Sequence, residues 1–186
     1  GINNTFRYKQ LSLSFLLDIR KGGDVFNGTE YALVLNGLSK KTLLNDRQSV
    51  TVTGVNSVTG EDFSQTYDAS QSYTIGSTTY AGVNMIQRYW SNYAANSYNF
   101  ITSVNWVKLR SLSLTYDFSD VLKGQKVIKG LSATAVGTNL FTWTNYKGMD
   151  PEVSAAGGTG GSGSTGIDYL GVPAVASFTF GVNITF

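Results

Sequence analysis

Apolar and polar residues alternate without a break in Phe178-Thr-Phe-Gly-Val-Asn-Ile-Thr-Phe186. Successive side chains of a β-strand point to opposite faces, so a period of two predicts a strand with one apolar and one polar face. The apolar face of this strand carries Phe178, Phe180, Val182, Ile184 and Phe186.

Three further stretches show the same alternation. They run from Leu11 to Ile19, from Ser111 to Phe118 and from Leu131 to Trp143. Ser and Thr dominate the polar face of all these strands, and Leu16 and Val136 are its apolar exceptions. Alternation fits a half-buried sheet of a soluble protein as well as a transmembrane barrel, so it does not by itself choose between them.

The composition excludes several classes of function. Among 186 residues there is no histidine and no cysteine, which rules out Ser-His-Asp and Cys-His nucleophiles, the usual zinc sites and disulfides. The 14 Lys and Arg are scattered and nearly balanced by 12 Asp and Glu, which argues against a nucleic-acid partner. No acid/base pair stands out, and we expect neither an enzyme nor a bound cofactor or metal.

Charged residues make up only 14% of the chain, whereas soluble domains carry about 25%. We therefore expect the chain to face something other than water or to be an unusual all-β module. No run approaches the roughly 18 apolar residues of a membrane helix, so helical spans are excluded.

Short and long connections alternate between the predicted strands. Outer-membrane barrels have tight periplasmic turns and long extracellular loops. By this rule 119–130 is a periplasmic turn, and 21–100 and 147–171 are extracellular loops. Within the first loop we expect a short helix over 24–35, strand-like stretches over 49–55 and 71–80, and a helical aromatic patch over 87–93.

Five stretches, in this order and spacing, carry a resemblance to a known family. They are Leu11-Ser-Leu-Ser-Phe-Leu-Leu-Asp-Ile-Arg-Lys-Gly-Gly-Asp-Val-Phe-Asn27, Trp106-Val-Lys-Leu-Arg-Ser-Leu-Ser-Leu-Thr-Tyr116, Gly137-Thr-Asn-Leu-Phe-Thr-Trp-Thr-Asn-Tyr-Lys-Gly-Met-Asp-Pro-Glu152, Gly166-Ile-Asp-Tyr169 and Ser177-Phe-Thr-Phe-Gly-Val-Asn-Ile-Thr-Phe186. With them the chain resembles the C-terminal part of a SusC/RagA-type TonB-dependent outer-membrane transporter of Bacteroidetes.

The resemblance implies an all-β fold, in which residues 1–186 supply the last strands and extracellular loops of an antiparallel transmembrane barrel of about 22 strands. It implies that the plug domain is absent from this chain. It also implies an importer of glycans or peptides in the outer membrane, working with a SusD-like surface lipoprotein. Energy would come from TonB, ExbB and ExbD through the absent N-terminal region.

Open strand edges support the same interpretation, because hydrocarbon cannot satisfy unpaired backbone N–H and C=O groups. We therefore expect strands outside this sequence to pair with these edges and close the barrel. The rival is a soluble secreted β-sandwich binding module, which would bury the apolar residues between two sheets. A passive porin or adhesin barrel is a third possibility.

Aromatic rings are expected to form girdles at the two membrane interfaces, although core filling in a sandwich would use them too. The girdle candidates are Tyr8, Tyr116 and Phe118 at the periplasmic ends, with Trp106, Phe141, Trp143 and Tyr146 at the other ends. The final strand, Phe178 to Phe186, resembles the signal read by the outer-membrane assembly machinery; an ordinary buried edge strand is the alternative.

Four aromatic residues in the long loop are candidates for contact with a ligand or partner, against the commoner use in loop self-packing. They are Tyr89, Trp90, Tyr93 and Tyr98. The Gly161–Gly166 stretch matches a dinucleotide fingerprint only as a string, and a flexible loop is favoured.

Two cations have an ambiguous direction. Lys108 and Arg110 share parity with Leu112, so in a regular strand they would point at lipid, near the phosphates of lipopolysaccharide in the outer leaflet. A β-bulge would instead turn them inward, and the sequence leaves both possibilities open. Asp150, Glu152 and Asp168 offer oxygen atoms for calcium, but solvated loop charges are the default expectation.

Overall fold

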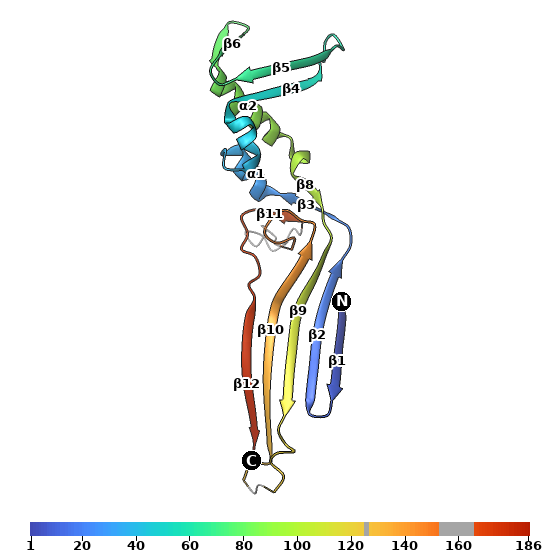
Figure 1. Ribbon diagram of the computed structural model, residues 1–186. Coiled ribbons are helices and arrows are strands. Elements are labelled where there is room, and N and C mark those ends of the chain that lie inside the picture. Colours follow the sequence, from blue (N-terminus) through green and yellow to red (C-terminus); the bar gives the residue numbers. More distant parts are fainter. Residues whose placement is uncertain (125–126, 153–165) are drawn as a thin grey trace, which may run out of the picture. The chain divides into compact units, whose positions relative to one another are not determined.

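The computed structural model describes residues 1–124, 127–152 and 166–186 (Figure 1). These residues form two compact units, residues 1–25 with 102–186 and residues 26–101. Most of the glycine-rich stretch expected to be a flexible loop lies outside the described residues. The described residues contain no helix that is both long and apolar enough to cross a membrane.

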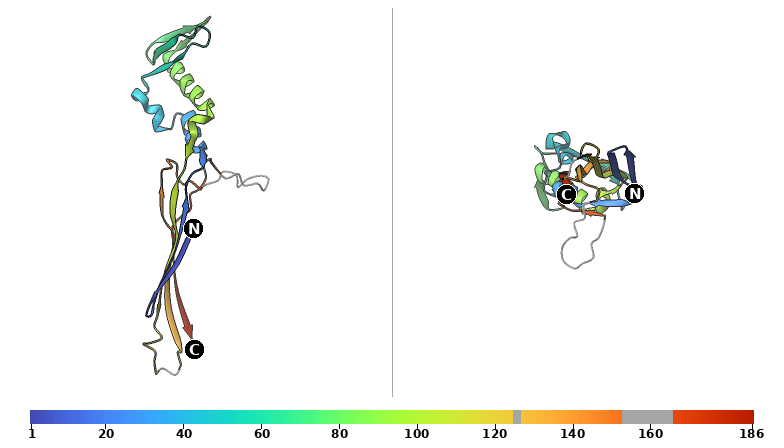
Figure 2. Two further views of the ribbon diagram at one scale, coloured as in Figure 1. Left: turned by 90° about the vertical axis from the view of Figure 1, so that its right-hand side faces the viewer. Right: turned by 90° about the horizontal axis from the view of Figure 1, so that it is seen from below.

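The first unit contains a five-stranded antiparallel sheet in the order β1-β2-β9-β10-β12. Seen from the side, the strands follow one another as a single layer (Figure 2). The four predicted strands are confirmed, and the all-β fold class with them. The strands are β1 (Ile2–Tyr8), β2 (Leu11–Arg20), β9 (Trp106–Asp117), β10 (Gly130–Thr144) and β12 (Ser177–Thr185).

Strand β1 was not predicted from the sequence. Asn4 interrupts its apolar face, so the segment lacks a clean period of two. It pairs with β2 through a tight hairpin in which Lys9 adopts a positive φ of 51°. Phe6 lies opposite Leu13, and its ring stacks on Phe15 with centroids 6.1 Å apart.

Apolar side chains line up in rows across one face of this sheet. Leu13 pairs with Leu114, Leu114 with Ala135, and Ala135 with Phe180. Leu114 is 44% exposed and Phe180 is 80% exposed, so nothing described in this unit covers the row. A β-sandwich would have buried these residues beneath a second sheet. The opposite face carries hydroxyl ladders such as Thr115 with Thr134, whose oxygens are 3.0 Å apart.

A β-bulge interrupts the alternation at Arg110. On β2, neighbouring Leu16 and Leu17 pair with Ser111 and Leu109, so Arg110 is the extra residue. One added residue moves the side chains on one side of a bulge to the opposite face of the sheet. The residues of β9 before Arg110 therefore alternate in the opposite sense to those after it. Lys108 therefore lies opposite Asp18 on the polar face. Of the two possibilities that the sequence leaves open for Lys108 and Arg110, the bulge that turns them inward is confirmed.

The second unit is built from two hairpins and short helices. Its core packs Val34, Ala94 and Phe100, with Trp90 and Tyr93 against them. Its elements are α1 (Gly28–Leu35), a 3-10 segment (Lys40–Arg47), β4 (Ser49–Val55), β5 (Asp62–Asp68), β6 (Ser72–Ile75), β7 (Thr78–Ala81), α2 (Gly82–Ala95) and a second 3-10 turn (Ser97–Phe100).

The structure refines the expectations for this loop region. The strand over 49–55 and the helical aromatic patch over 87–93 are confirmed. The stretch 71–80 is a hairpin of two strands, and 24–35 begins as β3 (Asp24–Asn27) before α1 starts. Strands β3, β8 (Ile101–Ser103) and β11 (Ile167–Asp168) form a small sheet in the order β11-β3-β8.

Gly82 gives a test of the packing in the second unit. Its N–H donates to the Gln71 carbonyl at 2.7 Å, and a Cβ atom added here would lie 1.7 Å from the backbone oxygen of Asp68. Gly82→Ala is expected to destabilise this unit by about 1–3 kcal/mol or more, because the obstructing atom belongs to the backbone. Gly54→Ala, with nothing within 4 Å of the added atom, is the matched control. Proteolysis of 26–101 that is equally fast in both variants would contradict this packing.

Candidate functional site

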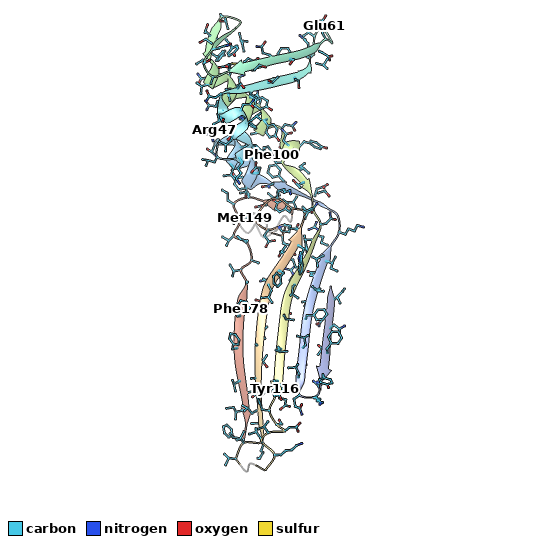
Figure 3. All side chains as sticks on the ribbon, viewed as in Figure 1. Arg47, Glu61, Phe100, Tyr116, Met149 and Phe178 are labelled. Atoms are coloured by element: carbon cyan, nitrogen blue, oxygen red, sulfur yellow. The ribbon has the colours of Figure 1, made fainter. Side chains whose placement is uncertain are left out.

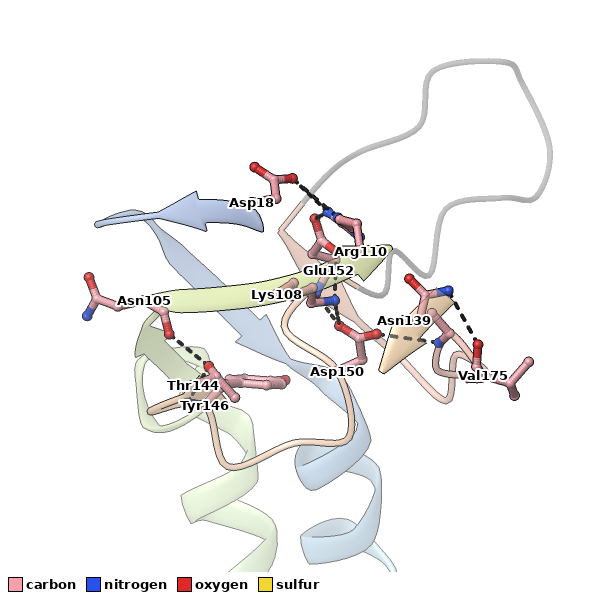
Figure 4. A network of polar contacts seen from close by, with 11 residues as sticks. Asp18, Asn105, Lys108, Arg110, Asn139, Thr144, Tyr146, Asp150, Glu152 and Val175 are labelled. Atoms are coloured by element: carbon pink, nitrogen blue, oxygen red, sulfur yellow. Dashed lines mark hydrogen bonds and ion pairs between the residues drawn. The ribbon is translucent and has the colours of Figure 1, made fainter. Parts of the chain in front are cut away.

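The strongest concentration of interacting charges lies on the polar face of the sheet, next to the bulge (Figure 4). Lys108 is only 4% exposed. Its Nζ lies 2.6 Å from Asp150 Oδ1 and 2.6 Å from Glu152 Oε2. One lysine of β9 thus holds two carboxylates of the connection that follows β10.

Arg110 extends the network to β2. Its Nη2 lies 3.0 Å from Asp18 Oδ2 and 2.5 Å from Glu152 Oε1. Both cations also lie over the Trp106 ring, at 5.5 Å for Lys108 and 5.4 Å for Arg110. A cation over an aromatic face is attracted by the ring quadrupole, and more strongly where water is excluded. We call Trp106, Lys108, Arg110 and their three carboxylate partners the charged network.

The two carboxylates from the loop are held ionised. Burial of Asp150 raises its pKa, but the Lys108 ammonium and the backbone N–H groups of Glu152 and Ala174 outweigh burial and bring the pKa below 3.8. Burial likewise opposes ionisation of Glu152, and Arg110 and Lys108 outweigh it, so its pKa also lies below its ordinary value. The stabilisation is complete at neutral pH and disappears as the pH falls through these lowered pKa values.

A second buried contact holds the same loop. The Tyr146 hydroxyl donates to Asp168 Oδ2 at 2.6 Å, and both residues are buried. Burial, followed by this hydrogen bond to the carboxylate, raises the pKa of the Tyr146 hydroxyl. Tyr146 also packs with Val25, Val104 and Trp106.

The expectation of solvated loop charges is therefore wrong for Asp150 and Asp168. Their carboxylates are buried and paired because the loop folds back onto the sheet. Among the described residues no group of three or more potential ligands is arranged to hold a metal ion. The chemistry that the charged network offers is electrostatic anchoring of Asp150 and Glu152 to β9.

The girdle candidates divide into two groups. Phe141 and Trp143 are exposed and stack with centroids 5.7 Å apart, and Tyr116 meets Phe118 at 4.6 Å. Tyr8 is exposed beside its hairpin. Trp106 and Tyr146 instead lie in the buried cluster, so their rings are not on the outer surface.

The aromatic patch of the second unit is partly a packed core. Tyr89, Trp90 and Tyr93 contact one another, with centroid distances from 5.0 to 6.5 Å. Tyr98 is 79% exposed, and no ring contact joins it to them within the described residues. A pocket of about 390 Å³ opens beside Tyr89 and Tyr93 and is also lined by Arg88 and three asparagines. The sequence did not predict this pocket, because Tyr67 and Ile75 of its wall come from separate hairpins.

Residues of the last strand lie on an outer edge of the five-stranded sheet. Phe178 projects from β12 (Figure 3), and Phe178, Phe180 and Val182 are all exposed. Ile184 and Phe186 are also exposed. Their role as an assembly signal stays a prediction.

No family model matches the chain. Comparison with curated proteins finds relatives in Formosa agariphila, a member of the Bacteroidetes. The chain is 23% identical to TonB-dependent receptor P3 over 188 residues and 24% identical to TonB-dependent receptor P26 over 196 residues. Both alignments cover 100% of this chain and 16% of the relative. TonB-dependent receptor P39 is 34% identical over 89 residues, which is 47% of this chain and 8% of that protein.

Lys108→Ala tests the charged network. Removing the ammonium leaves the buried Asp150 carboxylate without its ion-pair partner, and loss of one member of a buried ion pair costs about 3–5 kcal/mol. We expect faster hydrogen exchange in 145–152 and a lower melting temperature in the receptor that contains this chain. The control is Lys123→Ala, whose exposed pair with Asp120 at 2.7 Å contributes little. Equal exchange in the two variants would show that the network does not anchor the loop.

Proposed function

Because the chain is related over its whole length to TonB-dependent receptors, which are outer-membrane transporters, we propose that it forms part of the barrel wall and extracellular loops of an active importer. The chain spans about 16% of the length of relatives P3 and P26. In this proposal the rest of such a receptor supplies the other strands, the plug domain and the segment that contacts TonB.

The observation that carries the proposal is the uncovered apolar face of the five-stranded sheet. Burying a large apolar side chain gains about 1.5–3 kcal/mol, so a row of exposed Phe, Leu and Val calls for an apolar environment. Lipid provides this for the outer face of a barrel, while the Ser- and Thr-rich face suits a water-filled interior. In such a barrel the short connection 119–130 is a periplasmic turn, and the long connections 21–100 and 147–171 are extracellular loops.

The sheet edges support closure by further strands. Strands β1 and β12 each have one neighbour in the five-stranded sheet, which leaves one side of each without a partner strand there. Within hydrocarbon every backbone N–H and C=O needs a partner. Strands from the remainder of a full receptor would pair with both edges and complete the barrel.

We propose a glycan or a peptide as cargo, capture together with a SusD-like lipoprotein, and energy from TonB, ExbB and ExbD. The pocket of the second unit supports a cargo role for two of the four aromatic candidates. Tyr89 and Tyr93 offer flat rings with hydroxyl groups, and Arg88 and Asn92 beside them offer several hydrogen-bond donors. Such a combination suits a sugar or a peptide, which presents apolar patches between polar groups. The cargo is moved without chemical conversion.

The membrane-facing direction of the apolar row can be tested by placing a cation on each face of β9. Leu114→Arg is expected to cost about 2–4 kcal/mol if the residue meets lipid near mid-membrane. Ser113→Arg is the matched control, because Ser113 is next to Leu114 in the sequence but lies on the opposite, polar face of the sheet. The measurement is the folded, heat-modifiable fraction of the full receptor in outer membranes. If Ser113→Arg were the more damaging variant, the two faces would be assigned the wrong way round.

The cargo pocket can be tested with Tyr89→Ala and Tyr98→Ala. Loss of the Tyr89 ring is expected to weaken cargo binding by about 1–2 kcal/mol, which is roughly five- to thirtyfold. Tyr98→Ala removes an equally large ring outside the pocket and should leave uptake unchanged. Growth of strains carrying the full receptor on single purified polysaccharides or peptides gives the readout. A growth defect found only with Tyr98→Ala would show that the cargo binds outside the pocket.

A further inference from the structure

Helix α2 carries pocket-lining residues on two opposite faces. Arg88, Tyr89 and Asn92 line the pocket described above. Residues three or four positions apart share one face of a helix, so a second stripe at 83, 86, 87 and 90 lies on the other side. This second stripe lines a separate pocket of about 450 Å³ with Val83, Ile86, Gln87 and Trp90. We call it the Arg47 pocket, after the residue that gives it its charge.

Much of the wall of the Arg47 pocket is aliphatic. Val34 and Ile86 are buried, whereas Leu35 is 49% exposed and Val83 is 58% exposed. Part of this apolar wall is therefore in contact with water. Transfer of apolar surface out of water is favourable, so the wall favours an apolar group of a ligand.

Arg47 is the only charged residue among the described residues that line this pocket. Its Nη2 donates to the Gly37 carbonyl at 2.6 Å and lies 3.4 Å from Thr42 Oγ1. Within the described residues no carboxylate pairs with Arg47, and its Nε and Nη1 hold no hydrogen bond. The guanidinium is thus held at one nitrogen and keeps further donors for an anion.

The turn that carries Arg47 has an unusual backbone. Asn45, Asp46 and Arg47 have positive φ angles of 48°, 52° and 63°. Residues other than glycine rarely adopt this left-handed conformation, and three in succession raise the free energy of the turn. Such outliers cluster at binding sites, where the surrounding structure holds them in place. The strained turn is a second indication, beside the unpaired guanidinium, of a binding role for Arg47.

A carboxylate next to an aliphatic group matches this pocket. The planar guanidinium of arginine suits a carboxylate, to which it donates strong, charge-assisted hydrogen bonds. A sugar ring is a poorer match, because its hydroxyl groups would lose water against Val34, Val83 and Ile86 and find no partner there. The last residue of a peptide presents one side chain and one carboxylate. The side-chain amide of Gln87, which holds no hydrogen bond in the part of the chain that the structure describes, can pair with the peptide backbone.

We propose that the Arg47 pocket binds the C-terminal residue of a peptide, with its carboxylate on the Arg47 guanidinium and an apolar side chain on Val34, Val83 and Ile86. The inference rests on the proposed import function and selects a peptide as the cargo. It adds a contact on the face of α2 opposite Tyr89.

The test uses the full receptor that contains this chain, purified in detergent and titrated calorimetrically with three peptides. They share one Gly- and Ser-rich sequence and end in Leu with a free carboxylate, in Leu with an amide, or in Ser with a free carboxylate. The free Leu peptide is expected to bind about tenfold more tightly than its amide, because hydrogen bonds to ionised groups are the stronger ones. The peptide that ends in Ser should bind more weakly than the free Leu peptide, since it covers less of the aliphatic wall.

Two variants of Arg47 locate this preference in the pocket. Arg47→Gln should bind the free and the amidated Leu peptides equally. Arg47→Lys keeps the charge but loses the planar donor group, so it should retain part of the preference. Lys40→Gln is the matched control, because it removes an exposed cation from the same 3-10 segment outside the pocket, and its preference should be unchanged.

Each contrary result has a definite meaning. Equal binding of the free and amidated peptides by the unmodified receptor, or a preference that survives in Arg47→Gln, would overturn the proposed site. A uronic-acid oligosaccharide that binds in place of the peptides and is lost in Arg47→Gln would make the ligand an acidic glycan and overturn the peptide assignment. Heat-modifiable migration is measured first. A receptor that lacks it would refute the barrel itself, whereas a heat-modifiable receptor that does not distinguish the peptides would refute only this inference.

Discussion

The structure depends on one constraint, which is that an antiparallel sheet of a single layer keeps all its large apolar side chains on one face. Leu13, Leu114 and Phe180 belong to one row of that face, and no second layer in the first unit covers them. Each exposed side chain of this size forgoes about 1.5–3 kcal/mol of burial in water. Such a face is stable only against an apolar surrounding, and in the proposed barrel that surrounding is lipid.

The bulge at Arg110 lets the same strand satisfy two requirements. Without the extra residue, Lys108 would lie on the apolar face and Leu109 on the polar one. With it, Leu109 pairs with Leu17 on the apolar face, and Lys108 reaches Asp150 and Glu152 on the other. The conflict between the apolar rows and the charged network is thus resolved by a local change of register, which is a common use of bulges.

The sequence predicts strongly periodic elements well and long-range pairings poorly. Strands β2 and β12 are visible from alternation alone, whereas Asn4 conceals β1 by placing a polar residue on its apolar face. The face to which the Lys108 side chain points depends on how β9 pairs with β2 and β10. The apolar pattern of β9 alone does not reveal this pairing. Its partner Asp150 lies 42 residues away, so its buried state follows only from the return of the loop onto the sheet.

A spin-label scan along β9 measures directly the reversal of lipid exposure that the bulge produces in the proposed barrel. The chain contains no cysteine, and single cysteines can be placed at each position of 107–116 and labelled in a full receptor that has no other cysteine. In bilayers, oxygen should relax the labels at 107, 109, 112, 114 and 116, and a water-soluble nickel reagent should relax those at 108, 111, 113 and 115. An unbroken alternation through 110 would contradict the bulge, and labels shielded from oxygen throughout would contradict the lipid-facing sheet.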